Sequence, residues 1–254
     1  MKKNTIAFRV TGRYALFSDP VTRVGGEKCT YSIPTYQALK GICESIYWKP
    51  SIIWVVDKCR IINRIKTESK GIRVPNYVDR KKNDLSVYTY LKDVEYRVQA
   101  HFEWNENRPE LAEDRDEKKH YLIAKRMLAR GGRRDIFLGT RECQGYVEPC
   151  LFDEGSGAYD KKGNEDLTVS FGIMVHGITY PDESGTNEMK TRLWDARMYN
   201  GVIDFIRPEE CTMWMDTGNY QIKSFVPEKN FSGLSEFKEE GDTDGMDDAI
   251  ISDV

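Results

Sequence analysis

The clearest pattern in the chain is a strict alternation of apolar and polar residues near its middle. From Val94 to Trp104 every second residue is apolar, and the residues between them are polar. A period of two is typical of a β-strand with one buried face. A shorter alternation, with apolar Ile6, Phe8 and Val10, predicts a first strand. The stretch Ile52 to Ile65 is rich in β-branched residues and predicts another.

Two segments between these strands favour helices. Apolar residues recur at three- and four-residue intervals between Pro34, which can begin a helix, and Pro50, which can end one. The charged segment from Arg115 to Arg130 contains strong helix formers, and the two glycines after it are a typical C-terminal stop. Tyr146 to Phe152 can supply a further strand.

The predicted order of strand, helix, strand, strand, helix, strand is the β-α-β-β-α-β arrangement of the ferredoxin-like, RRM-like fold. This scaffold is frequent among RNA-binding proteins. We therefore predict an α+β protein whose residues 1–152 form a ferredoxin-like N-terminal domain.

The second part of the chain is expected to be all-β. Alternation from Val169 to Val175 predicts a strand, and Asn200-Gly201 predicts a hairpin turn between Leu193–Tyr199 and Val202–Arg207. We assign residues 153–225 to a small antiparallel β-sheet domain. Residues 226–254 are acidic with few core-forming residues, and we expect a disordered tail there.

Charge is distributed unevenly. The whole chain of 254 residues has a net charge of −3, but the segment from Ser232 to Val254 contains eight acidic residues and one lysine. The remaining chain therefore has a net charge of +4. A weakly basic body is compatible with nucleic-acid binding without requiring it.

Several classes of protein are disfavoured by composition. No apolar run reaches the roughly 18 residues of a membrane-spanning helix, and the N-terminus lacks the apolar core of a signal peptide. A cytoplasmic protein without a membrane partner is expected. The six cysteines form no C-x-x-C pair and the three histidines lack zinc-site spacing, so we expect reduced cysteines, no metal and no cofactor.

Positive charge is concentrated in two stretches. Lys58 to Lys82 contains nine basic and two acidic residues, and Arg115 to Arg134 contains eight basic and two acidic residues. Four tyrosines lie within or near them: Tyr77, Tyr88, Tyr90 and Tyr121. Cationic groups neutralise phosphates and aromatic rings stack on unpaired bases, so this mixture suits RNA. An ordinary solvated surface is the alternative.

The segment Lys118-Lys119-His120 could carry chemistry. A histidine can exchange a proton with a ribose 2′-hydroxyl or a leaving 5′-oxygen, and an adjacent lysine can stabilise a pentacoordinate phosphorus. On spacing alone, a surface histidine is the more common interpretation. Gly131-Gly132-Arg133-Arg134 could either hold a phosphate or form a helix cap with a charged turn.

Several longer motifs resemble one known family, the Cas-five family of type I-C CRISPR systems (its d variant, or Dvulg subtype), within the RAMP superfamily. They extend from the first strand to about Pro208 and are Tyr14–Pro20, Gly25–Lys28, Ser32–Pro50 (SIPTYQALKGICESIYWKP), Tyr88–Val94, Gly131–Gly139 (GGRRDIFLG), Arg141–Pro149 (RECQGYVEP) and Met174–Gly177 (MVHG). Their length and composition make a chance match a poor explanation.

The resemblance implies a function as well as a fold. It implies a metal-independent endoribonuclease that binds the repeat hairpin of precursor CRISPR RNA and cuts at its base, leaving a 2′,3′-cyclic phosphate. It also implies that the protein stays on the mature 5′ handle in a surveillance complex with a backbone subunit and a large subunit. Residues 1–152 would then be the RNA-binding and catalytic domain.

The resemblance also assigns residues. The family's catalytic tyrosine falls on Tyr47 and its lysine–histidine pair on Lys119 and His120. The sequence leaves open whether Tyr47 or His120 acts as base, and whether Lys118 replaces Lys119. RNA binding is expected from basic residues in the two positive stretches: Lys118, Arg126, Arg133, Arg134, Lys58, Arg64 and Lys66.

Three alternatives remain at this stage. The first is a non-catalytic structural subunit bound to the 5′ handle, and the intact catalytic set disfavours it. The second is an RRM-type adaptor, which lacks its aromatic RNP1 motif here. The third is a metal-dependent nuclease, whose clustered carboxylates and histidines are missing.

Overall fold

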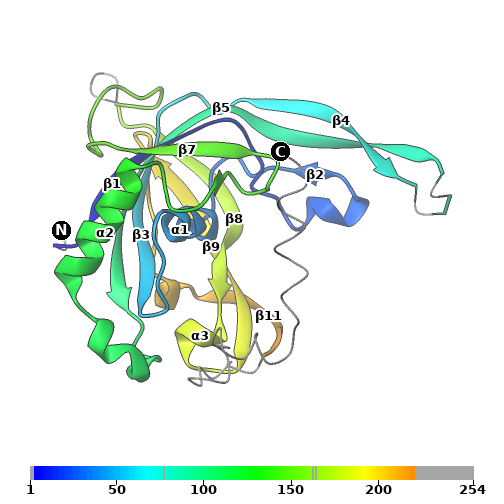
Figure 1. The fold of residues 1–254 in the computed structure, drawn as a ribbon. Coiled ribbons are helices and arrows are strands. Elements are labelled where there is room, and N and C mark those ends of the chain that lie inside the picture. Colours follow the sequence, from blue (N-terminus) through cyan, green and yellow to red (C-terminus); the bar gives the residue numbers. More distant parts are fainter. Residues whose placement is uncertain (1–2, 77, 80, 162, 164, 221–254) are drawn as a thin grey trace, which may run out of the picture. The chain divides into compact units, whose positions relative to one another are not determined.

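A computed structural model describes residues 3–76, 78–79, 81–161, 163 and 165–220, and a mostly antiparallel sheet runs through them (Figure 1). Its longest strand, β5 (Asn83–Trp104), pairs antiparallel with β1 (Ile6–Ala15) on one side and β3 (Ile52–Ile61) on the other. β7 (Gln144–Pro149) pairs with the outer side of β1. These four strands therefore lie in the order β3-β5-β1-β7.

The later strands continue from the edge of β3. β8 (Thr168–Thr179) and β9 (Glu188–Tyr199) form an antiparallel pair, and β10 (Val202–Asp204) joins β9 to β3. β11 (Met213–Asn219) also pairs with β9. Asn200 and Gly201 have φ angles of 49° and 82°, as a type I′ turn requires, so the predicted hairpin is confirmed.

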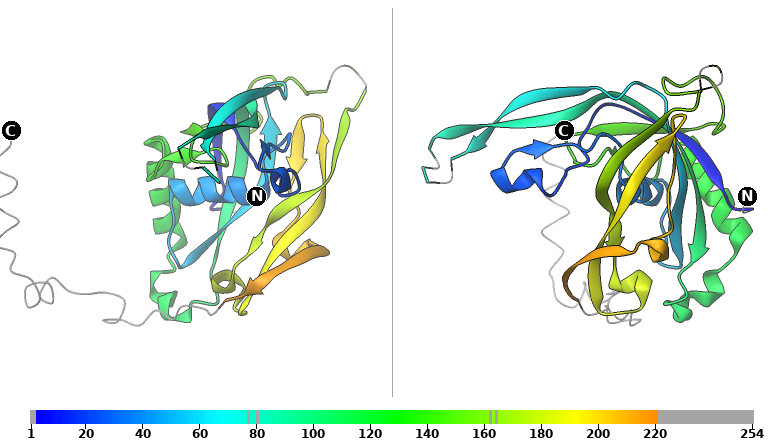
Figure 2. Two further views of the ribbon diagram at one scale, coloured as in Figure 1. Left: turned by 90° about the vertical axis from the view of Figure 1, so that its right-hand side faces the viewer. Right: turned by 180° about the vertical axis from the view of Figure 1, so that it is seen from behind.

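Two long helices fill the space beside the sheet. α1 (Tyr36–Ile46) begins at Thr35, whose hydroxyl accepts the Ala38 N–H, and it buries apolar residues against β3 and β8. α2 (Glu117–Ala129) contacts α1 and β7. α1 lies between α2 and the β8–β9 pair (Figure 2). Both helices were predicted, although α2 begins two residues later than Arg115.

The first half of β5 belongs to a hairpin that the sequence does not reveal. β4 (Thr67–Pro75) pairs with Asn83–Leu91, and this hairpin extends beyond the four-stranded part of the sheet (Figure 1). β4 alternates between exposed and half-buried side chains, and the paired half of β5 has buried side chains only at its end, Tyr90 and Leu91, so no apolar stripe marks the hairpin. Asp93, with a φ of 51°, separates the hairpin from the core part of β5.

Some predicted boundaries are wrong, and some elements are short. β3 ends at Ile61 rather than Ile65, and the strand predicted from Tyr146 is β7, which ends at Pro149. The remaining elements are η1 (Thr22–Gly25), β2 (Lys28–Cys29), η2 (Pro109–Asp114), β6 (Ile136–Phe137), α3 (Pro181–Ser184) and η3 (Pro208–Glu210). Short segments such as these carry too few residues for a periodic signal.

The predicted domain limits are not decided by this architecture. The division between residues 152 and 153 stays a prediction, and the tail predicted for 226–254 lies outside the described residues. Among the described helices, none combines the length and apolar character that a membrane crossing requires.

A buried histidine packs where β8 meets α1. His176 is fully buried, stacks on Tyr36 with ring centroids 4.3 Å apart, and donates from Nε2 to the Ile206 carbonyl at 2.9 Å. Burial and the nearby positive charge of Arg192 lower the pKa of His176 from 6.5 to about 4. The imidazole is therefore neutral in the folded protein at neutral pH.

This histidine makes stability depend on pH. Between about pH 6.5 and 4 the unfolded chain binds a proton that folded His176 does not, so the free energy of unfolding falls as pH decreases. The expected total loss is about 3 kcal/mol. Urea unfolding from pH 7 to 4.5 should show a shallower pH dependence in His176→Gln than in wild type. Equal slopes would contradict the buried, neutral state.

Candidate active site

Tyr47 lies at the C-terminus of α1, in the strand-like backbone conformation that ends the helix. Its N–H donates to the Cys43 carbonyl at 2.9 Å, and its own carbonyl accepts the Trp54 indole N–H at 2.7 Å. The side chain is 2% exposed. Because both the N–H and the carbonyl of Tyr47 are hydrogen-bonded, its backbone is held in place and the phenol ring leaves the helix end in a defined direction.

His120 lies in the first turn of α2, whose N-cap Asp116 accepts the Lys119 N–H. It shares the buried helix face with Ala124 and Leu128, four and eight residues further on. His120 has no exposed surface, and the Trp104 ring packs against it with centroids 5.6 Å apart. Helical spacing thus turns this histidine inward, whereas the lysines before it are exposed.

Both ring nitrogens of His120 are hydrogen-bonded. Nε2 lies 2.6 Å from the Asp114 carbonyl oxygen, and Nδ1 lies 2.8 Å from the Tyr47 hydroxyl. A carbonyl can only accept, so Nε2 carries a hydrogen. In the neutral imidazole Nδ1 is then the acceptor, and Tyr47 donates its hydroxyl proton to it. The two side chains therefore form one hydrogen-bonded pair.

Lys119 joins this pair through Asp114. Its Nζ lies 2.6 Å from Asp114 Oδ1, and the Ser51 hydroxyl donates to Asp114 Oδ2 at 3.1 Å. The same Oδ2 lies 3.4 Å from His120 Nε2. Lys118, in contrast, is exposed on α2, and within the described residues it makes no contact with Asp114 or His120. Tyr47, Lys119 and His120 are thus brought together, without Lys118.

The charges of the site shift two pKa values. Burial raises the pKa of the Tyr47 hydroxyl; the Asp114 carboxylate raises it further, and the Arg133 guanidinium opposes this. The hydrogen bond from Lys119 lowers the pKa of Asp114, with smaller contributions from Ser51 and His120, while burial opposes them. At neutral pH Tyr47 therefore keeps its proton, and Asp114 is a carboxylate.

The glycine–arginine loop after α2 is attached to the end of α1. The backbone N–H groups of Arg133 and Arg134 both donate to the Ser45 carbonyl at 3.0 Å. Their amides therefore complete the C-terminus of α1, while their side chains are exposed. Arg130, Arg133, Arg134 and the exposed ring of Tyr146 line an open hollow of about 590 Å³.

The other predicted RNA-binding residues fall into two separate groups. Arg126 is exposed on α2, seven residues from Lys119 and hence on the same side of the helix. Lys58 lies in the second half of β3, about 23 Å along the strand from Ser51, and Arg64 and Lys66 follow the end of β3 at Ile61. Lys58 is paired there with Asp204 at 2.9 Å.

The predicted stacking tyrosines are less available than the sequence indicates. Tyr90 is only 5% exposed, so it is a core residue and the prediction is wrong for it. Tyr88 and Tyr121 are partly buried against the core, with the ammonium groups of Lys28 and Lys125 over their rings. Tyr77 lies outside the described residues.

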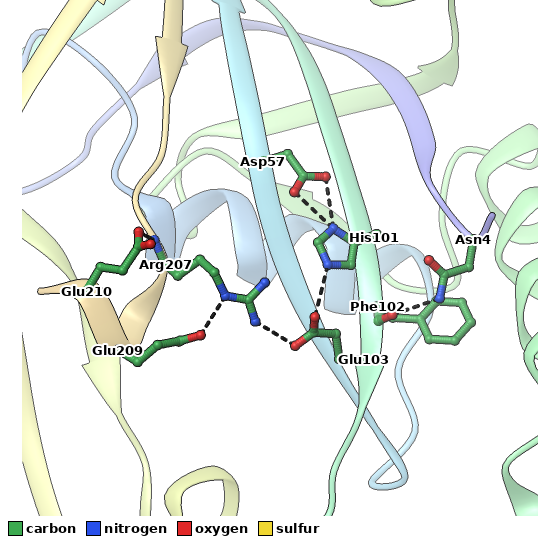
Figure 3. Close-up of polar contacts among 8 residues, drawn as sticks. All are labelled: Asn4, Asp57, His101, Phe102, Glu103, Arg207, Glu209 and Glu210. Atoms are coloured by element: carbon green, nitrogen blue, oxygen red, sulfur yellow. Dashed lines mark hydrogen bonds and ion pairs between the residues drawn. The ribbon is translucent and has the colours of Figure 1, made fainter. Parts of the chain in front are cut away.

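His101 belongs to a different polar network. Its Nδ1 lies 2.9 Å from Asp57 and its Nε2 lies 3.4 Å from Glu103, which is paired with Arg207 at 2.8 Å (Figure 3). This chain of contacts joins β3, β5 and the segment after β10. His176 lies in a separate buried cluster with Tyr36 and Trp194, so neither histidine is part of the site around His120.

Neither Asp114 nor Ser51 is marked by any motif or spacing in the sequence. Asp114 is the last residue of η2, in the acidic run Glu113-Asp114 that precedes the basic start of α2. An acidic run next to a basic run indicates that ion pairs form between them, but it does not specify which carboxylate contacts which lysine. Ser51 is 1% exposed and lies immediately before β3.

The sequence matches the family described as CRISPR-associated protein (Cas_Cas5) over residues 5–206. A protein of Mannheimia succiniciproducens named CRISPR pre-crRNA endoribonuclease Cas5d is 28% identical, covering 79% of this chain and 94% of the relative. A Thermus thermophilus protein with the same name is 27% identical, covering 71% and 76%. A crystal structure described as a CRISPR-associated protein is 36% identical with a TM-score of 0.69, covering 83% and 96%.

Gly132 is expected to control how the loop attaches to α1. Its φ is +106°, and an added Cβ would lie 3.1 Å from the Arg134 carbonyl oxygen. Gly132→Ala should lower the free energy of unfolding by about 1–3 kcal/mol. Gly41→Ala, inside α1 with open space around it, should instead raise it by about 0.5–1 kcal/mol. Urea unfolding distinguishes them, and equal effects would contradict the strained loop.

Proposed function

The chain belongs to the Cas5d family of CRISPR-associated proteins. From this premise we propose that it is an endoribonuclease, which binds the repeat hairpin of precursor CRISPR RNA and cuts at its base. The contact between Tyr47, His120 and Lys119 carries the proposal. Tyr47 at the end of α1 meets His120 in the first turn of α2 within hydrogen-bonding distance, and Lys119 and His120 both contact Asp114. A purely structural subunit has no need of such a cluster.

The chemistry requires only groups that RNA and this cluster supply. The 2′-hydroxyl gives up its proton as its oxygen attacks the adjacent phosphorus, the P–O5′ bond breaks, and O5′ takes up a proton. The products therefore carry a 2′,3′-cyclic phosphate and a 5′-hydroxyl. Tyr47 keeps its proton because its pKa is raised, so His120 is the group that exchanges a proton with the RNA and Tyr47 orients it. The Lys119 ammonium stabilises the additional negative charge on the pentacoordinate phosphorus.

We propose two regions for RNA binding. Lys119 and Arg126 on α2 lead to Arg133 and Arg134 in the loop, which gives a basic track beside the cleavage site. Lys118 flanks this track. Lys58, Arg64 and Lys66 are too distant to hold the same nucleotides, so we assign them to another part of the RNA.

The same proposal extends to fold, partners and location. The element order β1-α1-β3-β5-α2-β7 and the strand order β3-β5-β1-β7 support a ferredoxin-like arrangement with β2, β4 and β6 added. We propose that the protein remains on the 5′ handle in a cytoplasmic complex with a backbone subunit and a large subunit, as family membership implies.

Lys118 and Lys119 provide a matched pair for testing the site. Under single-turnover conditions with saturating protein and excess EDTA, His120→Ala and Lys119→Ala should each slow repeat cleavage by at least about 100-fold. Lys118→Ala should slow it less than about fivefold, because the exposed Lys118 side chain forms no hydrogen bond or ion pair with Asp114 or His120 in the described part of the chain.

The same assay separates the competing functions. A wild-type protein that binds the hairpin tightly without cutting it would be a structural handle-binding subunit. A large loss in Lys118→Ala with a small one in Lys119→Ala would mean that the wrong lysine is assigned. Binding of each variant to a hairpin lacking the 2′-hydroxyl at the cut site serves as the control for folding.

A further inference from the structure

The Asp114 carboxylate is surrounded by groups that would otherwise suit a phosphate. Lys119 Nζ and the Ser51 hydroxyl contact its two oxygens at 2.6 and 3.1 Å, and His120 Nε2 lies 3.4 Å from one of them. An ammonium, a hydroxyl and an imidazole N–H are all hydrogen-bond donors to anionic oxygens. In this structure the anion among these three donors is the side chain of Asp114.

The same residue covers the histidine. Tyr47 is 2% exposed and His120 is completely buried, and the Asp114 carbonyl occupies the only ring nitrogen of His120 that does not face Tyr47. No RNA oxygen can contact His120 in this arrangement. Asp114 must move before His120 can exchange a proton with RNA.

The segment that carries Asp114 is suited to such a movement. η2 spans six residues, Pro109 to Asp114, which is longer than most 3₁₀ helices, and none of them is buried. Its flanks are held more firmly: Arg108 is paired with Asp182, and Arg115 contacts Glu106 at 2.6 Å. A weakly packed segment between two fixed ends can open locally at low cost.

We propose that the Asp114 carboxylate occupies the position of the scissile phosphate, and that RNA displaces it to bind Lys119, Ser51 and His120. The inference rests on the proposed function and adds Ser51 as a phosphate ligand. The exchange replaces one anion by another, so Lys119 keeps an anionic partner and buried Ser51 keeps an acceptor. Part of the RNA-binding free energy is spent on displacing Asp114, which lowers the apparent affinity.

The test compares Asp114→Asn with Glu113→Gln. Each variant removes one negative charge from η2, but Glu113 is exposed and makes no contact with Lys119, Ser51 or His120 within the described part of the chain. Affinity is measured in EDTA with a repeat hairpin whose 2′-hydroxyl at the cut site is replaced by hydrogen. Asp114→Asn should bind about fivefold more tightly than wild type, and Glu113→Gln should bind within about twofold of it.

Single-turnover cleavage at saturating protein completes the test. Asp114→Asn should cut at least as fast as wild type, and adding Ser51→Ala to it should weaken binding about fivefold. Weaker binding or slower cutting by Asp114→Asn alone would overturn the inference and make Asp114 a positioning residue. An unchanged affinity on adding Ser51→Ala would remove Ser51 from the phosphate site.

Failure of the proposed function gives a different pattern. If no protein cuts the ribose hairpin while Asp114→Asn still binds more tightly than Glu113→Gln, the phosphate site stands and the nuclease assignment falls. If wild type cuts but Asp114→Asn binds no more tightly, the phosphate-site inference alone is contradicted.

Discussion

The pairing of β5 is the constraint on which the rest of the structure depends. Its 22 residues hold β4 along the first half, β1 along the middle and β3 along the last half. The strand ends at Trp104, whose ring packs against His120, and the chain then enters the η2 segment that carries Asp114. One strand therefore positions the projecting hairpin at one end. At its other end it positions Trp104 and the segment that carries Asp114, which both contact His120.

Burial determines what the candidate site can do. A histidine on a solvated helix would exchange its proton freely with water, whereas His120 has one nitrogen directed to Tyr47 and the other to a main-chain carbonyl. These two bonds select its tautomer and align its ring. The same burial raises the pKa of the Tyr47 hydroxyl, so the phenol keeps its proton at neutral pH. The groups that the proposed reaction needs are already in place, but His120 is completely buried. In our proposal, RNA binding exposes it.

Sequence periodicity predicts the core of this fold well and its surface elements poorly. The alternation around Val94–Trp104 and the Asn200-Gly201 turn reflect one buried face and two positive φ angles, which are local properties. The β4 hairpin has no comparable face, because β4 alternates only between exposed and half-buried side chains and its partner segment in β5 is buried only at Tyr90 and Leu91. The meeting of Tyr47 with His120 could be predicted only by resemblance, since 73 residues separate them in the chain. The position of Asp114 depends on how η2 meets the first turn of α2, which no residue pattern specifies.

The most direct measurement compares two repeat hairpins in excess EDTA, one all-ribose and one with hydrogen in place of the 2′-hydroxyl at the cut site. Attack by the 2′-oxygen predicts that wild-type protein binds both with equal affinity and cuts only the ribose hairpin. The upstream product should then end in a 2′,3′-cyclic phosphate. Cleavage of the deoxy-substituted hairpin, or cleavage that EDTA abolishes, would contradict the assignment of Tyr47, Lys119 and His120 as a metal-independent active site.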